Sequence, residues 1–183
     1  MTARSRPVLP VDGLVDAPAE PVTTGRLRQA LGRFVSGVIV VTTAEPDGRD
    51  VHGMTANAFS SVSLRPPLVL VSVANEAHLQ ARIHRTGRYG VSVLGAGQAA
   101  LAEHFAGRRP NAEPVSFHWR DGLPLLEPAL ARLTCTVVES VPAGDHTIHL
   151  GRVDTIDEQD GTPLVFHRGQ LAGLTTFPTT RQG

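Results

Sequence analysis

Short apolar runs, separated by glycine, proline and polar residues, recur along most of the chain. Runs of strand length predict strands over residues 38–43, 68–73, 89–94, 135–141, 146–153, 164–167 and 171–174. The run 68–73 follows a double proline and is so rich in leucine and valine that it predicts a strand buried on both faces. Helical spacing of apolar residues predicts a helix that starts at Thr23 or Thr24, continues to Phe34 and is ended by Ser36-Gly37. Two more helices are predicted over 77–83 and over 98–105.

Turn residues between these runs complete the expected fold. Turns are predicted over 45–50 and 143–145, at Asp160-Gly161 and at Arg168-Gly169, with the first and third of these closing hairpins. Many short antiparallel strands joined by turns predict a mainly β fold, a barrel or sandwich to which a few helices are added. Residues 1–22 carry four prolines and no periodicity, so we expect a disordered or loosely ordered extension before one domain over 23–183.

One polar stretch interrupts the apolar pattern directly before the strand 68–73. Its hydroxyl and amide side chains are Thr55, Asn57, Ser60, Ser61 and Ser63, and Met54 and Phe59 are interleaved with them. Burying such groups without partners costs roughly 1–3 kcal/mol each, so they belong at the surface or against a polar ligand. A polar loop would explain the composition alone. The interleaved apolar side chains favour an edge that holds a flat, polar molecule.

Composition excludes several classes of protein. With 183 residues, and 17 basic against 17 acidic side chains, the chain suits one domain and offers no nucleic-acid surface. We expect no membrane association, because no apolar run approaches the roughly 18–20 residues of a membrane helix and no signal peptide is recognisable. The single cysteine, Cys135, fits a reducing cytoplasm and is expected to be a buried apolar residue rather than a nucleophile.

Motifs of the common catalytic classes are absent: there is no Walker A loop, no G-x-S-x-G, no H-E-x-x-H and no C-x-x-C. A metal site is not expected either, because His146 and His149 fall on opposite faces of a strand and His78 and His84 are six residues apart. Gly95, Gly97 and Ala100 satisfy the dinucleotide-binding pattern G-x-G-x-x-A. Without an acidic residue at the expected place after it, a simple strand-to-helix turn is the better interpretation.

Four motifs carry a resemblance to a known family. They are HGMTANAFSSVSLRPPLVLVSVAN from His52 to Asn75, LAEHFAG from Leu101, WRDGLPLLEPALARLTC from Trp119, and GDHTIHLGRV from Gly144. Together they resemble the flavin reductase-like family over about residues 27–174, outside the N-terminal extension. The resemblance implies an FMN-binding split β-barrel. Many members are the reductase components of two-component flavin-dependent monooxygenases.

The implied activity is hydride transfer from NADH or NADPH to FMN or FAD. Reduced flavin would then diffuse to a partner monooxygenase, and a homodimer would form the complete site. Such an enzyme needs two stacked rings at near-contact distance rather than a strong acid or base, since the flavin supplies the redox chemistry. The sequence does not distinguish NADH from NADPH or FMN from FAD.

The resemblance also implies the site residues. His146 is the expected catalytic residue, on the nicotinamide side, with Asp145 beside it. The cofactor-binding residues that the resemblance implies at the flavin ring, ribityl chain and phosphate are Thr55, Ala56, Asn57, Ala58, Ser60, Ser61, Ser72, Ala74, Asn75, His104, Phe105 and Arg109. Arg108 and Arg109 could bind the flavin phosphate or could be solvated residues of a loop, and the sequence favours neither role. Trp119 is expected to pack in the core rather than to shield a ring.

Two features leave alternatives open. Glu76 stands where relatives commonly carry small hydroxyl residues that help to hold the phosphate, so either main-chain N–H groups and Arg109 take that role or flavin binds weakly. We expect FMN or FAD to be exchanged as a diffusible substrate. A flavin-binding module without reductase activity is one alternative. The other is an enzyme resembling pyridoxamine-phosphate oxidase, whose substrate phosphate would need a basic cluster such as Arg82, Arg85 and Arg88; those arginines also suit a solvated helix face.

Overall fold

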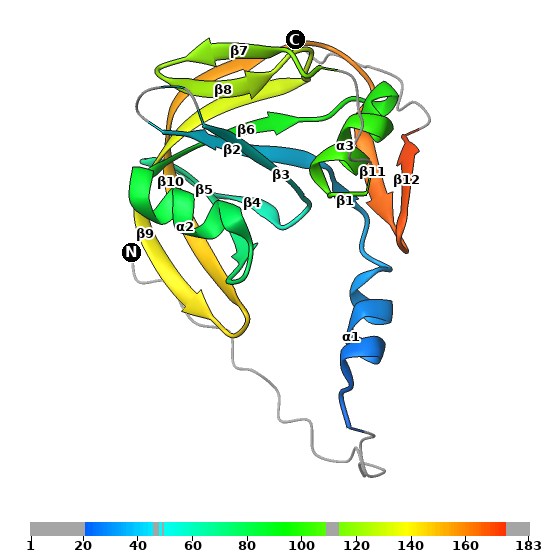
Figure 1. Ribbon diagram of the computed structural model, residues 1–183. Helices are drawn as coiled ribbons and strands as arrows, with labels where there is room; N and C mark the ends of the chain where they lie inside the picture. Colours follow the sequence, from blue (N-terminus) through cyan, green and yellow to red (C-terminus); the bar gives the residue numbers. More distant parts are fainter. Residues whose placement is uncertain (1–20, 46–47, 49, 109–113, 175–183) are drawn as a thin grey trace, which may run out of the picture.

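The computed structural model describes residues 21–45, 48, 50–108 and 114–174 (Figure 1). Its helices are α1 (Thr24–Leu31), α2 (His78–Thr86) and α3 (Ala99–Phe105), with a 3₁₀ turn η1 (Ala96–Gln98) directly before α3. The strands are β1 (Ser36–Gly37), β2 (Ile39–Ala44), β3 (Val51–Ala56), β4 (Phe59–Leu64), β5 (Pro67–Ala74), β6 (Arg88–Val93), β7 (Phe117–Arg120), β8 (Leu123–Leu126), β9 (Ala131–Ala143), β10 (His146–Glu158), β11 (Leu164–His167) and β12 (Gln170–Gly173). The prediction of a mainly β fold with a few helices is confirmed.

A seven-stranded antiparallel sheet forms the body of the protein, in the order β3-β2-β6-β9-β10-β5-β4. Its two outermost strands, β3 and β4, are consecutive in the chain and are joined by the corner Asn57-Ala58. The sheet therefore curls into a barrel whose two edges meet at this corner (Figure 1). The smaller sheets β1-β11-β12 and β7-β8 lie beside it.

Two apolar clusters fill the interior. The larger lies inside the curled sheet, where Val41, Val71 and Tyr89 are fully buried and α2 adds Leu79 and Ile83. The second joins β2, α3 and β11 through Val40, Ala102 and Leu164. Because α3 packs through this second cluster, its position depends on both the barrel and the small sheet.

Close packing explains one glycine of the barrel. A Cβ at Gly151 of β10 would collide with the phenol of the buried Tyr89, so only glycine fits there. Cys135 is buried in the same cluster as Tyr89, which confirms its expected place as a small apolar residue. Burial raises the pKa of its thiol to about 12, with the nearby Asp154 carboxylate adding to the shift.

Most predicted elements are present with shifted ends. The helix that starts after the cap Thr23 ends at Leu31, earlier than the apolar spacing suggests, and the strand predicted over 135–141 is longer, as β9. The turns over 143–145 and at Arg168-Gly169 join paired strands as predicted, and the strands on either side of 45–50, β2 and β3, are paired as well. The G-x-G-x-x-A run is a strand-to-helix turn, and because β6 pairs antiparallel with both neighbours it is no dinucleotide-binding βαβ unit.

Three predictions about the fold are wrong. In β5 only alternate residues are fully buried, because it packs on the core with one face and the other face is only partly covered. Asp160-Gly161 closes no hairpin, since β11 pairs with β1 and β12 rather than with β10. Trp119 is 45% exposed rather than in the core, because the two-stranded sheet β7-β8 places it at the surface near Gly48.

The N-terminal helix stands apart from the barrel. No residue of α1 is buried, and Leu31 and Phe34 are 63% and 77% exposed. Figure 1 shows α1 extending away from the body of the protein. The extension predicted over 1–22 falls almost wholly outside the described residues and stays a prediction. Among the helices described, none is long and apolar enough to cross a membrane.

Candidate functional site

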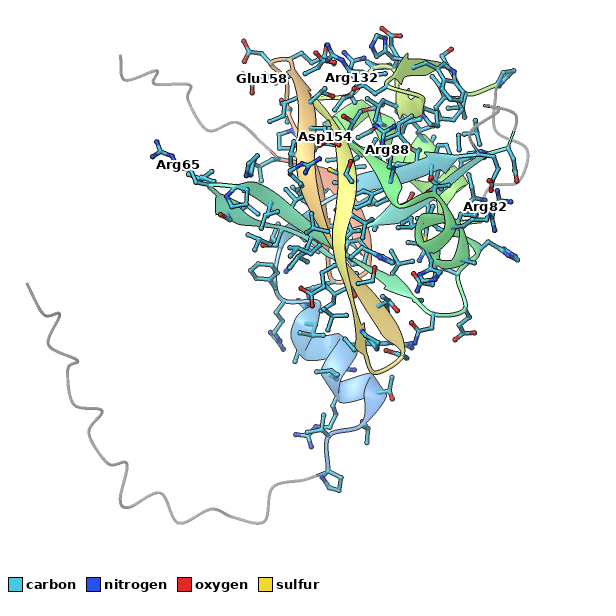
Figure 2. The ribbon with its side chains drawn as sticks, turned by 90° about the vertical axis from the view of Figure 1, so that its left-hand side faces the viewer. Arg65, Arg82, Arg88, Arg132, Asp154 and Glu158 are labelled. Carbon is cyan, nitrogen blue, oxygen red and sulfur yellow. The ribbon has the colours of Figure 1, made fainter. Side chains whose placement is uncertain are left out.

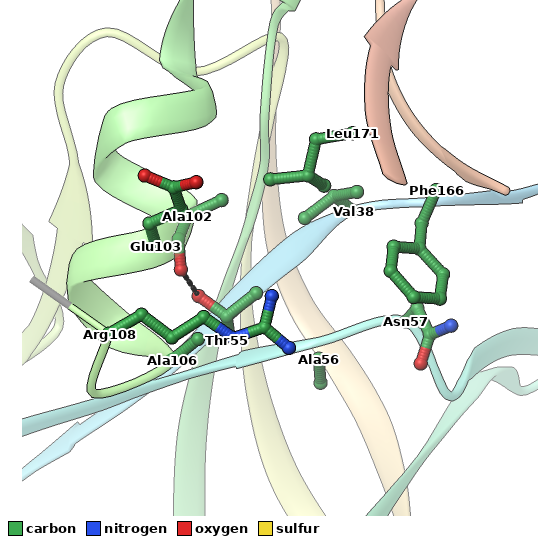
Figure 3. A pocket seen from close by; sticks show the side chains of 10 residues that line it. All are labelled: Val38, Thr55, Ala56, Asn57, Ala102, Glu103, Ala106, Arg108, Phe166 and Leu171. Atoms are coloured by element: carbon green, nitrogen blue, oxygen red, sulfur yellow. Dashed lines mark hydrogen bonds between the residues drawn. The ribbon is translucent and has the colours of Figure 1, made fainter. Parts of the chain in front are cut away.

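A pocket of about 190 Å³ opens between α3 and the corner where β3 leads into β4 (Figure 3). Residues from five parts of the chain line it: Val38, Thr55, Ala56, Asn57, Ala102, Glu103, Ala106, Arg108, Phe166 and Leu171. It therefore lies where the barrel, α3 and the small sheet β1-β11-β12 meet, and its shape depends on how these three parts pack together.

A hydrogen bond and a close packing contact fix α3 against β3. The Thr55 hydroxyl donates to the main-chain carbonyl of Ala102 at 2.7 Å, as the dashed line in Figure 3 marks. Two residues earlier in β3, Gly53 lies under the Phe105 ring, where a Cβ would come within 2.5 Å of a ring carbon. The position of α3 as a wall of the pocket thus depends on the Thr55 hydroxyl and on the absence of a side chain at Gly53.

The lining of the pocket is apolar on one side and polar on the other. Val38, Phe166 and Leu171 give apolar surface, whereas Thr55, Asn57 and Arg108 bring a hydroxyl, an amide and a guanidinium. The Asn57 amide donates to the Ser36 hydroxyl at 3.2 Å, which orients it at the pocket rim. In Figure 3 the Arg108 side chain extends past Thr55 towards the pocket. This combination fits a flat heteroaromatic ring with one polar edge, such as the isoalloxazine of a flavin.

A second group of predicted residues gathers where β5 ends and β10 begins. The main-chain N–H of Asn75 donates to the Asp145 carbonyl at 2.9 Å, and Ala74 is paired with His146 across the two strands. His146 Nδ1 lies 2.7 Å from the Asp145 carboxylate. That carboxylate accepts the Nδ1 proton, and the hydrogen bond to His146 holds the pKa of Asp145 below its ordinary value. Nε2 of the ring is thereby left as the atom available to a ligand.

The chain corner links the two groups. The main-chain N–H of Ser72 donates to the Ala58 carbonyl at 3.0 Å, and Ala58 directly follows the pocket residue Asn57. This bond therefore connects the predicted residues that line the pocket with those at the end of β5. His146 is nevertheless absent from the lining of the pocket, so within one chain the two groups form neighbouring rather than single surfaces.

Other predicted residues lie elsewhere. His104 and Phe105 belong to α3 but do not line the pocket; their rings contact each other edge to face at 5.0 Å, and Phe105 packs on Gly53. Ser60 and Ser61 are neighbours in β4, so their side chains point to opposite faces and one ligand reaches only one of them directly. Arg109 lies outside the described residues.

Six lining residues were not among those predicted from the sequence: Val38, Ala102, Glu103, Ala106, Phe166 and Leu171. Phe166 and Leu171 come from the C-terminal hairpin β11-β12, more than a hundred residues after the polar stretch, and no local pattern signals that this hairpin returns to it. Ala102, Glu103 and Ala106 stand inside the LAEHFAG motif, which was the signal available in the sequence.

The basic cluster that a substrate phosphate would need is already occupied. Arg82 pairs with Asp50, Arg85 pairs with Glu45, and the Arg88 guanidinium donates to the Asp121 carbonyl at 2.6 Å. Figure 2 shows Arg82 and Arg88 well apart. This arrangement disfavours the enzyme resembling pyridoxamine-phosphate oxidase. In the described part of the chain, no group of three or more histidine, cysteine or acidic side chains is placed to hold a metal.

Comparison with known proteins gives a consistent answer. The family described as "Flavin reductase like domain" matches residues 31–175. An NADH-dependent flavin reductase of a Rhodococcus species is 56% identical over 154 residues, which cover 84% of this chain and 88% of that one. The reductase component of 4-hydroxyphenylacetate 3-monooxygenase from Thermus thermophilus is 42% identical over 78% of this chain and 91% of its own length.

The fold agrees as well. The flavin reductase PheA2 superposes with a TM-score of 0.81 at 41% identity, over 85% of this chain and all of that one. The NADH:FAD oxidoreductase SgcE6 of Streptomyces globisporus, solved with NAD and FAD fragments, gives 0.77 at 36% identity over 88% and 99% of the two chains. The chain therefore belongs to the flavin reductase-like family, and the fold, family and enzyme class predicted from its sequence are confirmed.

Proposed function

We propose that this flavin reductase oxidises NADH and reduces FAD or FMN, binding the flavin ring in the pocket between α3 and the β3–β4 corner. The observation that carries the proposal is the pocket itself, in which Thr55, Asn57 and Arg108 face apolar side chains. NADH is chosen over NADPH because the relatives whose names specify the nucleotide use NADH. When bound, the flavin supplies the hydride acceptor, N5, for hydride from C4 of the nicotinamide.

The residues of the chain act by orientation and electrostatics. Negative charge develops at the N1–C2=O edge of a flavin on reduction, and the guanidinium of Arg108, a lining residue, would stabilise it together with main-chain N–H groups of the β3–β4 corner. His146 stands at the nicotinamide side and offers Nε2, while Asp145 fixes its tautomer. The predicted contacts of Ser60, Ser61, Ser72 and Asn75 with the ribityl chain and phosphate remain part of this proposal.

Reduced flavin is proposed to leave the enzyme and serve a separate monooxygenase. Two features support a substrate rather than a permanently bound cofactor. Glu76, directly after Asn75, is exposed and places a negative charge next to the expected phosphate position. The related protein from Thermus thermophilus is itself named as a monooxygenase reductase component.

A homodimer is proposed to complete the site. Leu27, Leu31 and Phe34 expose apolar surface around α1, and Val138 and Val141 expose more on β9. Clusters of exposed apolar residues mark protein interfaces. The separation of His146 from the pocket lining in one chain is compatible with a second copy that contributes to each site.

The experiment is an assay of release. The enzyme is kept on one side of a dialysis membrane under anaerobic conditions together with added NADH and free FAD or FMN, and the far side holds a redox dye that is fixed to a polymer too large to cross and is not reduced by NADH alone. Reduced flavin that leaves the enzyme crosses and bleaches the dye. Dye bleaching with NADH, and much slower bleaching with NADPH, is the expected result; a flavin that becomes reduced but stays with the protein contradicts the diffusible-product proposal.

A further inference from the structure

A chain of side-chain hydrogen bonds runs from the exposed Ser140, through the buried His149, to the edge that carries His146. It begins at Ser140 of β9, passes through His149 of β10 and Gln80 of α2, and reaches Thr147 of β10 and Asn75 at the end of β5. The distances are 2.9 Å from Ser140 to His149, 3.1 Å from Gln80 to Thr147, and 2.8 Å from Thr147 to Asn75. His149 is 0% exposed and Thr147 only 7% exposed.

The direction of every bond in this chain is determined. Thr147 donates its single proton to the Asn75 carbonyl oxygen, so it accepts from the Gln80 amide nitrogen. The Gln80 carbonyl oxygen then faces His149 Nε2, which must carry a proton. His149 Nδ1 is left to accept from the Ser140 hydroxyl. The network is therefore satisfied by one tautomer of a neutral histidine, and none of its buried members lacks a partner.

The last member of the chain holds the turn between β9 and β10. The Asn75 side-chain amide donates to the Gly144 carbonyl at 3.2 Å, while its main-chain N–H donates to the Asp145 carbonyl. Gly144 and Asp145 immediately precede His146. Asn75 itself is exposed, so without Thr147 its side chain has no buried group to fix its rotamer.

We propose that Gln80 and His149 are positioning residues for hydride transfer, which act through Thr147 and Asn75 to hold the Asp145–His146 turn where it meets the nicotinamide nucleotide. This inference rests on the proposed role of His146. The helix α2 already packs on the core through Leu79 and Ile83. In addition, its Gln80 forms hydrogen bonds with two polar residues of β10, Thr147 and His149. A fully connected polar network fixes one arrangement, because each change of partner leaves a buried polar group unpaired.

The test compares variants that remove one link while keeping the shape. Thr147→Val and Gln80→Met each break the chain between His149 and Asn75, and Thr147→Ser keeps the hydroxyl. Thr134→Val is the matched control. Thr134 is buried like Thr147, and its hydroxyl shares a hydrogen bond with the Thr155 hydroxyl across β9 and β10, outside the network. Steady-state kinetics are measured separately for NADH and for the flavin.

The expected result is impaired use of NADH at saturating flavin. Thr147→Val and Gln80→Met raise the KM for NADH or lower kcat by about tenfold, because misplacement of a positioning group costs one to two orders of magnitude. Because Asn75 is also a proposed contact of the flavin, the NADH kinetics are compared at saturating flavin, where Thr147→Ser restores the wild-type values. If both variants behave like Thr134→Val, losing stability with unchanged NADH kinetics, the network is structural only and the proposal is overturned.

Two further measurements separate this inference from the role of His146. ¹⁵N NMR of the wild type is expected to show His149 as the Nε2–H tautomer, and a different tautomer contradicts the network. His146→Ala tests the proposed function alone. If His146→Ala leaves NADH kinetics unchanged while Thr147→Val impairs them, the network positions Asn75 and the turn, but the role given to His146 is wrong.

Discussion

The Thr55 hydroxyl and the Ala102 carbonyl oxygen lie 2.7 Å apart, and this one bond joins the polar stretch of the sequence to the helix that forms the far wall of the pocket. Ala102 also accepts the main-chain N–H of Ala106 at 3.0 Å, so its carbonyl keeps one partner when Thr55 is changed. Thr55→Val is expected to cost about 0.5–1.5 kcal/mol of unfolding free energy.

The same substitution loosens α3 at the pocket. We expect the Kd for flavin to rise by about tenfold in Thr55→Val, because the wall that carries Ala102 and Arg108 is then held against β3 only by packing contacts. Flavin binding is measured by quenching of flavin fluorescence, and stability by urea unfolding. Thr55→Ser retains the hydroxyl and is the control; equal weakening in both variants would show that the hydrogen bond is not the cause.

Arg108 provides the second prediction. Its guanidinium is exposed and lines the pocket, so Arg108→Gln should leave the Tm nearly unchanged while flavin affinity falls by about tenfold, the loss of one charge-assisted contact. Arg65, labelled in Figure 2, stands at the tip of the β4–β5 hairpin, at the end of β4 opposite to the pocket corner, and offers a matched control. A wild-type affinity in Arg108→Gln would remove Arg108 from the proposed site.

The third prediction concerns Gly53. In Gly53→Ala the new methyl group meets the Phe105 ring at 2.5 Å, and a rigid aromatic ring cannot yield without moving α3. The expected cost is about 1–3 kcal/mol, together with weaker flavin binding. Gly97→Ala is the control, since a Cβ at Gly97 meets nothing within 4 Å. Similar stability of the two variants in thermal unfolding contradicts the packing described for α3.

Stability should fall on the acid side of neutrality. Burial lowers the pKa of His149 from its ordinary value of 6.5, with His84 adding to the shift. Burial also lowers the pKa of His52, followed by repulsion from Arg82 and His78 and opposed by Asp50. Both folded-state pKa values lie below those of the unfolded chain, so the unfolded state binds protons first as pH falls below 6.5.

Urea unfolding at a series of pH values checks this. The wild type is expected to lose stability as pH falls from 6.5 towards the lowered folded-state pKa values, and His149→Gln should flatten part of this dependence. A stability that is constant or rises over this range has the wrong sign and contradicts the burial of these rings.

The sequence predicted the barrel well because its signals are local. Turn residues such as Gly144 and Arg168-Gly169 stand between apolar runs of strand length, and these strands pair as expected. The errors arise where pairing partners are distant. Nothing near Asp160-Gly161 indicates that β11 joins β1 rather than β10, and nothing near Trp119 indicates that β7-β8 forms a separate sheet.

The site follows the same division. Thr55, Ala56 and Asn57 were expected from one continuous motif and do line the pocket, whereas Phe166 and Leu171 reach it only through the packing of the small sheet. The network of Gln80, Thr147 and His149 was also beyond the sequence, because its members come from α2 and β10 and only their three-dimensional contact reveals it. The alternation of side chains along a strand did predict that His149 lies on the opposite face of β10 from His146, and His149 is buried on that face.

The most direct test of the central claim is anaerobic mixing of the enzyme with excess free flavin and NADH, followed at about 450 nm, where oxidised flavin absorbs. The account predicts rapid bleaching of many flavins per enzyme, and a rate at least about tenfold lower in His146→Ala with little change in flavin affinity. A flavin that binds in the pocket but stays oxidised in the presence of NADH would contradict the account and leave a flavin-binding protein without reductase activity.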